Sequence, residues 1–269
     1  MNLDNMSFTE KIELAENTTD PEVLDQLSNS YFQNNYLTRA ILNNSNTSLF
    51  TILQLSLKYK AEVKTNWAYL NCDLNELAKY AKHETKEIRV AVAEHPKCPP
   101  DILDMLSEDE KYLVKEAVAE NKNTRLYTLL KLFIPLSFQV KRNPNYINCD
   151  LAELISYVEH KKPDVRAGIA AHPNCPPDVL EEPLSKDENK DVRKAVAAHP
   201  KCPPHVLEHP LSTDEMKQVR SAVARNENCY RHVLEKLSTD SDYGVRTSVA
   251  KNENCSPELL EDPLSKDKK

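Results

Sequence analysis

"VRKAVAAHPKCPPHVLEHPLSTD", residues 192–214, is the stretch that decides the fold, because close copies of it recur along the chain. It follows VRAGIAAHPNCPPDVLEEPLSKD at 165–187. It precedes VRSAVARNENCYRHVLEKLSTD at 219–240 and VRTSVAKNENCSPELLEDPLSKD at 245–267. The arginine in second place recurs every 26 or 27 residues, at positions 166, 193, 220 and 246. A fixed period of this length is the signature of a solenoid of stacked repeats.

Weaker copies extend the repeat toward the N-terminus. IRVAVAEHPKCPPDILDMLSED (88–109) and VKEAVAENKNTRLYTLLKL (114–132) share the pattern. A longer self-similarity pairs NTSLFTILQL (46–55) with NTRLYTLLKL (123–132), and WAYLNCDLNELAKY (67–80) with PNYINCDLAELISY (144–157). Both pairs are offset by 77 residues, which indicates duplication of a block of three repeats. We therefore expect one continuous solenoid of about ten repeats of about 25–28 residues.

Three segments differ in how faithfully they keep the repeat. Residues 1–45 are predicted to be degenerate capping repeats, 46–164 irregular aromatic-rich repeats, and 165–269 a regular array. Within the regular array the phase is helical, because Val192, Ala195 and Val196 fall on one face of a helix. His199-Pro200 is predicted to end that helix, because proline cannot continue its hydrogen bonding.

A period near 26 leaves room for one α-helix and one short α- or 3₁₀-helix, so the predicted class is all-α. The aspartate that precedes each first helix is predicted to be its N-cap, since its carboxylate can accept from free amides of the first turn. These aspartates are Asp187, Asp214 and Asp240.

The consensus VRxxVAxxPxCPPxVLExxLSxD resembles the leucine-rich repeat variant family of bacterial proteins. The resemblance implies a right-handed superhelix of alternating α- and 3₁₀-helices, similar to HEAT and armadillo solenoids. It covers 88–109 and 165–267 best, and it implies a bacterial origin but no common activity. One member carries an N-terminal iron–sulfur segment, but here no cysteine precedes Cys72, so we expect no such cofactor.

Composition narrows the classes of function. The chain has 2 Gly and 17 Pro in 269 residues, which disfavours glycine-loop nucleotide sites. A net charge of -7 makes extensive binding to nucleic acid unlikely. No apolar run is long enough for a membrane span, and the N-terminal sequence lacks a secretory signal pattern. We expect a cytoplasmic protein.

The cysteines form the first candidate column, since all occupy one position of the repeat. They are Cys72, Cys98, Cys149, Cys175, Cys202, Cys229 and Cys255, and Thr19, Thr47 and Thr124 hold the same place in other repeats. Stacked helices lie about 8–10 Å apart, too far for a disulfide between neighbours. The thiols are therefore predicted to fill small buried slots. Redox sensing is the alternative, and it requires an exposed thiol of low pKa.

Two further columns resemble sites. His95, His172 and His199 each precede a cysteine by three residues, but zinc needs four converging ligands and other repeats put Asn here. We expect these residues to cap helix ends, with no bound metal. Asp–Arg pairs also repeat, and we expect a ladder of salt bridges between repeats or, if the arginines face solvent, an anion-binding stripe. The pairs are Asp187/Arg193, Asp214/Arg220, Asp240/Arg246 and Asp109/Lys115.

The aromatic residues gather before the regular array, where they either fill a looser core or contact a partner. Segments 58–70 and 131–146 mix Lys or Arg with aromatics, and they supply the candidate partner-binding residues. These are Trp67, Tyr69, Lys141, Arg142 and Tyr146.

No catalytic motif or cofactor site is evident, and we expect a non-enzymatic scaffold for protein–protein interaction. A nucleic-acid-binding repeat protein is the first alternative, and it requires a continuous basic groove. A helical-repeat enzyme with an unrecognised site is the second alternative.

Overall fold

The computed structural model describes residues 3–31 and 33–256, and every regular element in these residues is a helix. This confirms the all-α prediction. The chain forms two compact units, Met1–Thr124 and Arg125–Lys269. The division between them falls inside the segment 46–164, and the predicted boundaries at 45 and 164 stay predictions. Residues 257–269, which end the predicted regular array, lie outside the described residues.

Unit 1 holds the first half of the repeats. Its helices are η1 (Leu3–Asn5), α1 (Phe8–Asn17), α2 (Pro21–Tyr31), α3 (Asn35–Asn43), α4 (Leu49–Leu55), α5 (Lys60–Thr65), α6 (Trp67–Leu70), α7 (Leu74–Tyr80), α8 (Lys86–Glu94), α9 (Pro100–Leu106) and α10 (Tyr112–Glu120). Each repeat has a first helix, which ends before the His/Asn position, and a second helix, which begins after the Cys/Thr position. The first helices here are α1, α3, α5, α8 and α10.

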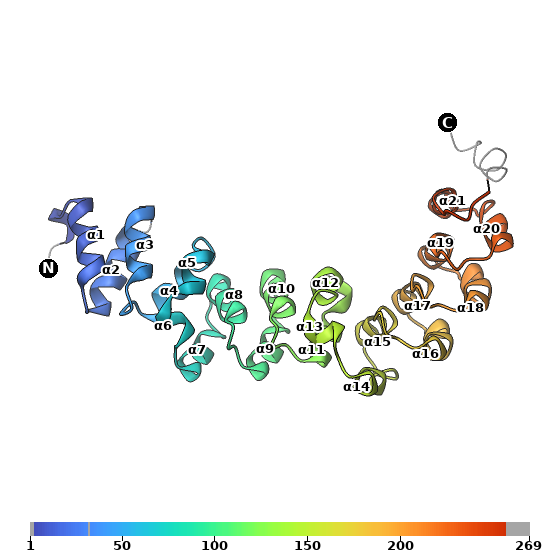
Figure 1. The fold of residues 1–269 in the computed structure, drawn as a ribbon, viewed down its shortest axis with the longest axis horizontal. Helices are drawn as coiled ribbons and strands as arrows, with labels where there is room; N and C mark the ends of the chain where they lie inside the picture. Colours follow the sequence, from blue (N-terminus) through green and yellow to red (C-terminus); the bar gives the residue numbers. More distant parts are fainter. Residues whose placement is uncertain (1–2, 32, 257–269) are drawn as a thin grey trace. The chain divides into compact units, whose positions relative to one another are not determined.

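Unit 2 continues the pattern. Its helices are α11 (Leu126–Lys131), α12 (Phe133–Val140), α13 (Pro144–Ile147), α14 (Leu151–Ser156), α15 (Pro163–Ala170), α16 (Pro177–Glu181), η2 (Leu184–Lys186), α17 (Lys190–Ala197), α18 (Pro204–Glu208), η3 (Leu211–Thr213), α19 (Lys217–Arg225), α20 (Arg231–Leu237) and α21 (Tyr243–Ala250). Within this unit, Figure 1 shows α15, α17, α19 and α21 in one row and α14, α16, α18 and α20 in a second row. The first-helix row lies on the inside of the bend that these repeats make.

The core of a regular repeat is formed by the apolar residues that recur at helical spacing. Val192 and Val196 of α17 are fully buried, as are Leu207 of α18 and Leu211 of η3. Proline stands at the start of α16 and α18, where its missing N–H costs no helical hydrogen bond. The second element of these repeats is a short α-helix followed by a 3₁₀ turn, which matches the expected repeat content.

The N-cap prediction for the aspartates is wrong. The residue that caps α17 is Asn189, whose side chain accepts from the N–H of Asp191. Asp187 lies two residues earlier, and its Oδ1 accepts from the N–H of Asn189 at 2.8 Å. Asp214 and Asp240 likewise accept from the backbone two residues on. The loop before each first helix contains an additional side-chain turn, which moves the aspartate out of the cap position.

The duplicated block contains an extra helical turn. In regular repeats two residues separate the His/Asn position from the cysteine, but five separate Asn66 from Cys72 and Asn143 from Cys149. The added residues form the one-turn helices α6 and α13. Each carries a tyrosine into the interior, with Tyr69 at 3% and Tyr146 at 0% exposure.

After the second inserted turn, α13, helix α15 packs closely against α11 and α12. A Cβ added at Gly168 of α15 would lie 2.7 Å from Leu130 Cδ2 and 3.3 Å from Phe133 Cβ. Sister repeats carry alanine or serine at this position. Glycine therefore lets α15 approach α11 and α12. No helix of the described residues is both long and apolar enough to cross a membrane.

Candidate interaction surface

Four arginines of the column, Arg89, Arg166, Arg193 and Arg220, form bidentate ion pairs with the aspartate of the next repeat. Arg193 Nε and Nη2 donate to the Asp214 carboxylate at 2.6 and 3.0 Å. Its Nη1 donates to the backbone carbonyls of Asp187 and Glu188 at 2.8 and 2.9 Å. The pair that sequence spacing suggested, Asp187 with Arg193, is thus a contact to the aspartate's carbonyl and not to its carboxylate.

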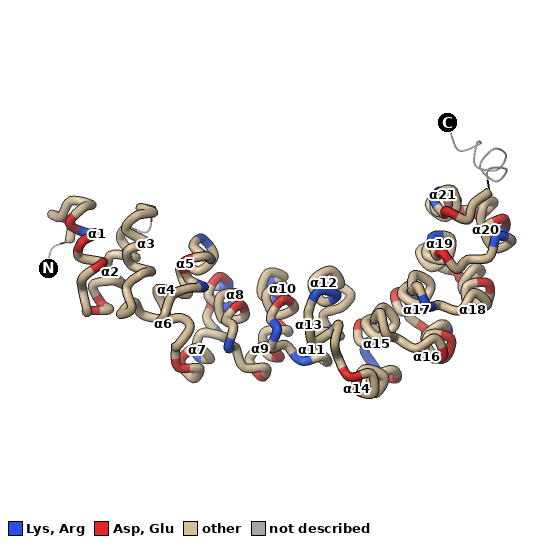
Figure 2. The backbone as a smooth tube through the Cα atoms, viewed as in Figure 1, with Lys and Arg blue, Asp and Glu red and all other residues tan. Residues whose placement is uncertain are grey.

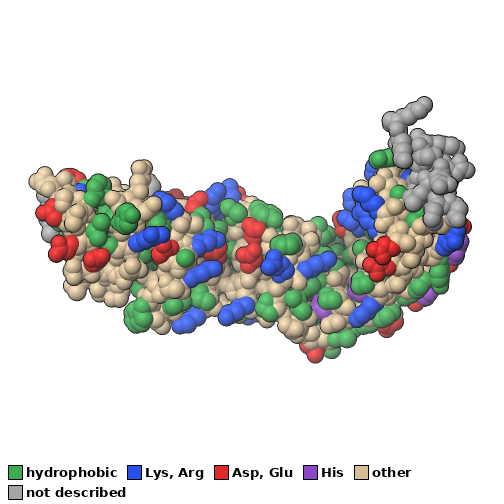
Figure 3. Space-filling model, turned by 45° about the horizontal axis from the view of Figure 1, so that its top comes forward, with side chains coloured by type: hydrophobic (Ala, Val, Ile, Leu, Met, Phe, Trp, Pro, Cys, Tyr) green, Lys and Arg blue, Asp and Glu red, His purple; other side chains and the backbone are tan. Residues whose placement is uncertain are grey.

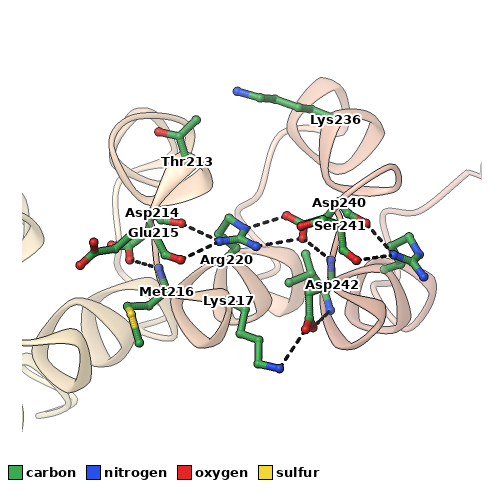
Figure 4. Close-up of polar contacts among 12 residues, drawn as sticks. Thr213, Asp214, Glu215, Met216, Lys217, Arg220, Lys236, Asp240, Ser241 and Asp242 are labelled. Carbon is green, nitrogen blue, oxygen red and sulfur yellow. Dashed lines mark hydrogen bonds and ion pairs between the residues drawn. The ribbon is translucent and has the colours of Figure 1, made fainter.

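The same arrangement recurs along the chain. Figure 4 shows Arg220 between the Asp214 and Glu215 carbonyls on one side and the Asp240 carboxylate on the other. Arg89 pairs with Asp109, and Arg166 pairs with Asp187, each at 2.6 Å. Arg246 Nη1 donates to the carbonyls of Asp240 and Ser241. Lys115 forms no ion pair with Asp109 within the described residues.

Both side chains of each ion pair are largely buried, so each charge depends on the other for compensation. The side chains of Arg193 and Asp214 are 11% and 7% exposed. Burial alone raises the pKa of Asp109, but hydrogen bonds from Arg89 and from the backbone outweigh it and lower that pKa below its usual value. The same balance lowers the pKa of Asp240 beside Arg220. Because the guanidinium groups are engaged inside the stack, the ladder does not present an open anion-binding stripe.

The His/Asn column joins each repeat to the preceding one. His199 Nδ1 accepts from the N–H of Lys201 at 2.9 Å, and Nε2 lies 2.9 Å from the carbonyl of His172. This arrangement requires a neutral ring that carries its proton on Nε2. His95 and His172 have the same two contacts, to the carbonyls of Tyr69 and Tyr146. Burial lowers the pKa of all three imidazoles.

Asparagine makes equivalent contacts where it replaces histidine. Asn226 Nδ2 donates to the carbonyls of Ala197 and His199 at 2.8 and 3.0 Å, and its Oδ1 accepts from the N–H of Asn228. Both ring nitrogens of each column histidine are occupied in the same way, so these side chains serve as caps. Within the described residues no group of three or more His, Cys, Asp or Glu could hold a metal ion.

The cysteines are free thiols, and each one from Cys72 to Cys229 stands directly before the residue that precedes a second helix. Burial raises the pKa of Cys98, Cys175, Cys202 and Cys229 to about 12. It also raises the pKa of the half-buried Cys72, Cys149 and Cys255. These thiols lack the low pKa of a reactive cysteine. Where threonine fills the slot, as at Thr124, its hydroxyl donates to a buried carbonyl, that of Val118, at 2.6 Å.

Two of the five candidate partner-binding residues are interior, which corrects the sequence prediction. The Tyr146 hydroxyl donates to the carbonyl of Gly168 at 2.7 Å, and the Tyr69 hydroxyl donates to that of Ala91 at 3.2 Å. Both rings pack edge-on against a column histidine. Trp67 is 67% exposed, and Lys141 and Arg142 are exposed too. Trp67 belongs to unit 1, and the two basic residues belong to unit 2.

Sequence reasoning missed two aromatic–histidine clusters. Phe50, Tyr80 and His83 form one, with the Phe50 ring centroid 5.9 and 5.8 Å from the other two. Tyr127, Tyr157 and His160 form the other, with the Tyr127 ring centroid at 5.5 and 5.4 Å. The members correspond at the offset of 77 residues, so a position-by-position comparison of the duplicated blocks would have found them.

Unit 2 has a groove of about 320 Å³ on its first-helix row. Helix α15 forms its floor between α12 and α17, with Ala167 and Ala171 facing Ala195 and Ala198. Phe133 and Ile134 of α12 add apolar surface, and Ile134 is 39% exposed. Lys141, Asp191 and Lys194 line the same groove.

Unit 1 has a hollow at the corresponding helices with more charged residues in its lining. It is about 300 Å³, and its charged residues are Lys60, Lys64, Glu94, Glu120 and Lys122. Lys60 and Glu94 form an ion pair at 2.5 Å across it. Both signs of charge occur on α17, α19 and α21 in Figure 2, and hydrophobic side chains are interspersed with them over the face shown in Figure 3. The continuous basic groove that the nucleic-acid alternative requires is therefore interrupted by carboxylates, Asp191 among them.

The comparisons with known proteins concern the fold alone. No model of a protein family matches the chain, and no curated protein matches it. Among solved structures, the chain is similar to one described as a leucine-rich repeat variant with a novel repetitive protein structural motif. The identity is 19% and the TM-score 0.43, over 91% of this chain and 82% of that chain.

Proposed function

We propose that this helical repeat protein is a non-enzymatic scaffold that binds a protein partner through the groove of unit 2. The observation that supports it most is the apolar floor of the groove, where Ala198 is exposed and Ala171 half-buried beside the 39% exposed Ile134, with charged side chains around it. An apolar centre with a polar rim is the usual anatomy of a protein–protein interface.

The internal columns support the same proposal by elimination. Arginines, aspartates and histidines that look like chemistry in the sequence are engaged in contacts between repeats, and the cysteine Cys202 is a buried thiol of raised pKa. What remains available to a partner is the surface that varies between repeats, and in solenoids this surface is where binding specificity lies.

A photo-crosslinking experiment tests the proposal. Full-length protein carrying benzoylphenylalanine in place of Ile134 is irradiated in lysate of its source cells, and crosslinked species are identified by mass spectrometry. The matched control carries the same group in place of Lys236, an exposed residue of α20 in the second-helix row. We expect a discrete protein adduct at position 134 only. Equal labelling at both positions, or nuclease-sensitive adducts alone, would refute a protein partner in this groove.

A further inference from the structure

We propose that the groove of unit 2 binds an acidic peptide segment that inserts a bulky apolar side chain between α12 and α17. This inference rests on the proposed function and names the chemistry of the partner. It is carried by three features of the groove: its size, its unpaired cations and its contrast with unit 1.

The size of the groove suits a side chain. Its volume of about 320 Å³ is at the lower end of the range of small-molecule sites. The floor is made of alanines, so a partner's backbone can approach α15 closely. Phe133 and Ile134 on one side give an inserted leucine, isoleucine or phenylalanine apolar contacts. Such an anchor in a desolvated pocket supplies most of the energy of a small interface.

The charges around this floor favour an acidic occupant. Lys141 and Lys194 are exposed at its two sides, and neither pairs with a carboxylate within the described residues. These two cations line the groove together with one carboxylate, Asp191. Arg142, next to Lys141 in the sequence, is exposed outside the groove, with its guanidinium 5.0 Å from the ring centroid of Phe138. Complementary charge raises the association rate and selects the partner.

The basic character continues along the first-helix row. The position held by Ala171 and Ala198 is taken by Arg225 in α19 and by Lys251 after α21, and both are exposed. An acidic segment that leaves the groove toward the C-terminal repeats thus meets two further cations. Clustered cations that no neighbour neutralises are costly unless a partner compensates them, because like charges repel.

Unit 1 provides the internal contrast. The equivalent position holds Glu94 and Glu120, and the adjacent Lys60 is already paired with Glu94. Lys64 and Lys122 also line that hollow, but its two carboxylates stand where unit 2 has alanines. We therefore expect an acidic segment to bind unit 1 more weakly than the groove of unit 2. The apolar floor and Asp191 make the groove of unit 2 a poor match for a phosphate backbone, which needs uniform positive charge.

The experiment selects peptides from a phage-displayed library of random linear sequences on the purified full-length protein. We expect enriched sequences that combine Asp or Glu with Leu, Ile or Phe. A fluorescein-labelled copy of the best sequence is then measured by fluorescence anisotropy. Its affinity should fall at least about tenfold in the double variant Lys141→Glu/Lys194→Glu, and it should weaken as salt is raised.

A second variant tests the groove without changing charge. Ala198→Trp fills the hollow from an exposed position, so the fold should be retained while the peptide loses at least about tenfold in affinity. Lys236→Glu, on the second-helix row, is the matched charge control and should bind as the parent does. Circular dichroism of every variant verifies the helical fold.

Four results overturn the inference. Enrichment of basic or uncharged sequences that still compete for the groove contradicts the acidic partner, while the proposed function stands. Binding that neither Ala198→Trp nor the double lysine variant weakens places the peptide elsewhere. Tighter binding of labelled oligothymidylate than of any selected peptide, lost in the same variants, assigns the groove to nucleic acid. The absence of both an enriched peptide and a crosslink at position 134 removes the inference and the proposed function together.

Discussion

The regular repeats of unit 2 and the two repeats that contain α6 and α13 stack on their neighbours with different chemistry. In the regular repeats an arginine reaches the carboxylate of the next repeat, as Arg193 reaches Asp214. In the repeats with the extra turn, that arginine position holds Lys60 or Ser137. The following aspartate position then holds His83 or His160, packed against aromatic rings. One fold therefore keeps its register with either an ionic or an aromatic contact.

The two substitutions are physically linked. A buried aspartate without its arginine would be an uncompensated charge, which is strongly destabilising. A neutral histidine carries no such cost, and His83 Nδ1 still accepts the backbone N–H of Thr85, as Asp109 accepts that of Lys111. Loss of the arginine and replacement of the aspartate thus belong together, and duplication of the block copied both.

The largest loss of stability is expected from a variant that breaks the ionic contact. Arg193→Ala leaves the Asp214 carboxylate, 7% exposed, without its partner. We expect the free energy of unfolding to fall by about 3–5 kcal/mol, as for other buried pairs that lose one member. The measurement is urea denaturation followed by far-UV circular dichroism.

Two companion variants sharpen that result. Lys217→Ala removes an exposed pair with Asp242, in which the lysine is 59% exposed, and should cost about 0–1 kcal/mol. Adding Asp214→Asn to Arg193→Ala removes the stranded charge while an amide oxygen can still accept from Met216, so stability should partly recover. A double variant no more stable than Arg193→Ala would show that the charge is not the cause of the loss.

A smaller loss of stability is expected from variants of the buried tyrosines in the extra turns. Tyr146→Phe deletes the hydroxyl that donates to the buried carbonyl of Gly168 at 2.7 Å, and it should cost about 1–2 kcal/mol. Tyr69→Phe removes a longer bond, of 3.2 Å, and should cost less. The same denaturation assay checks both. Tyr112→Phe, at a 52% exposed position, is the control, and an equal loss there would contradict the role of the buried hydroxyl.

The repeat and its helical class could be predicted because they depend on periodic, local information. The apolar helical spacing and the proline that begins α9, α16 and α18 are visible within single repeats, and aligning the repeats gives the period. The contacts of the columns were harder, because they join side chains to a different repeat. Sequence spacing suggested Asp187 for Arg193, whereas the carboxylate partner is Asp214, 21 residues on.

The candidate site was predicted least well. Whether a side chain is available to a partner depends on its burial, and burial depends on how the helices pack. Tyr69 and Tyr146 look like surface anchors beside basic residues, but the extra turn directs both inward. The groove of unit 2 depends on alanines such as Ala171 and Ala198, which stand out in the sequence only by being small. Lys141 lines the groove, but its neighbours there from α15 and α17 are distant in sequence, and a partner-binding role for Lys141 and Arg142 stays a prediction.

The smallest expected effect concerns pH and compares histidine with asparagine in one column. Burial lowers the pKa of His199 below the value near 6.5 that it has when unfolded. Below about pH 6.5 the unfolded chain therefore binds more protons, and stability falls as pH drops toward the lowered folded pKa.

His199→Asn keeps the contacts that Asn226 shows and removes one titrating ring. Urea midpoints at about pH 7.5 and about pH 5 should thus differ less for the variant than for the parent. The exposed pairs His205–Glu181 and His232–Glu208 are the same in both proteins and cancel in the comparison. An unchanged pH dependence would mean that His199 titrates alike in both states and that its ring tolerates a second proton.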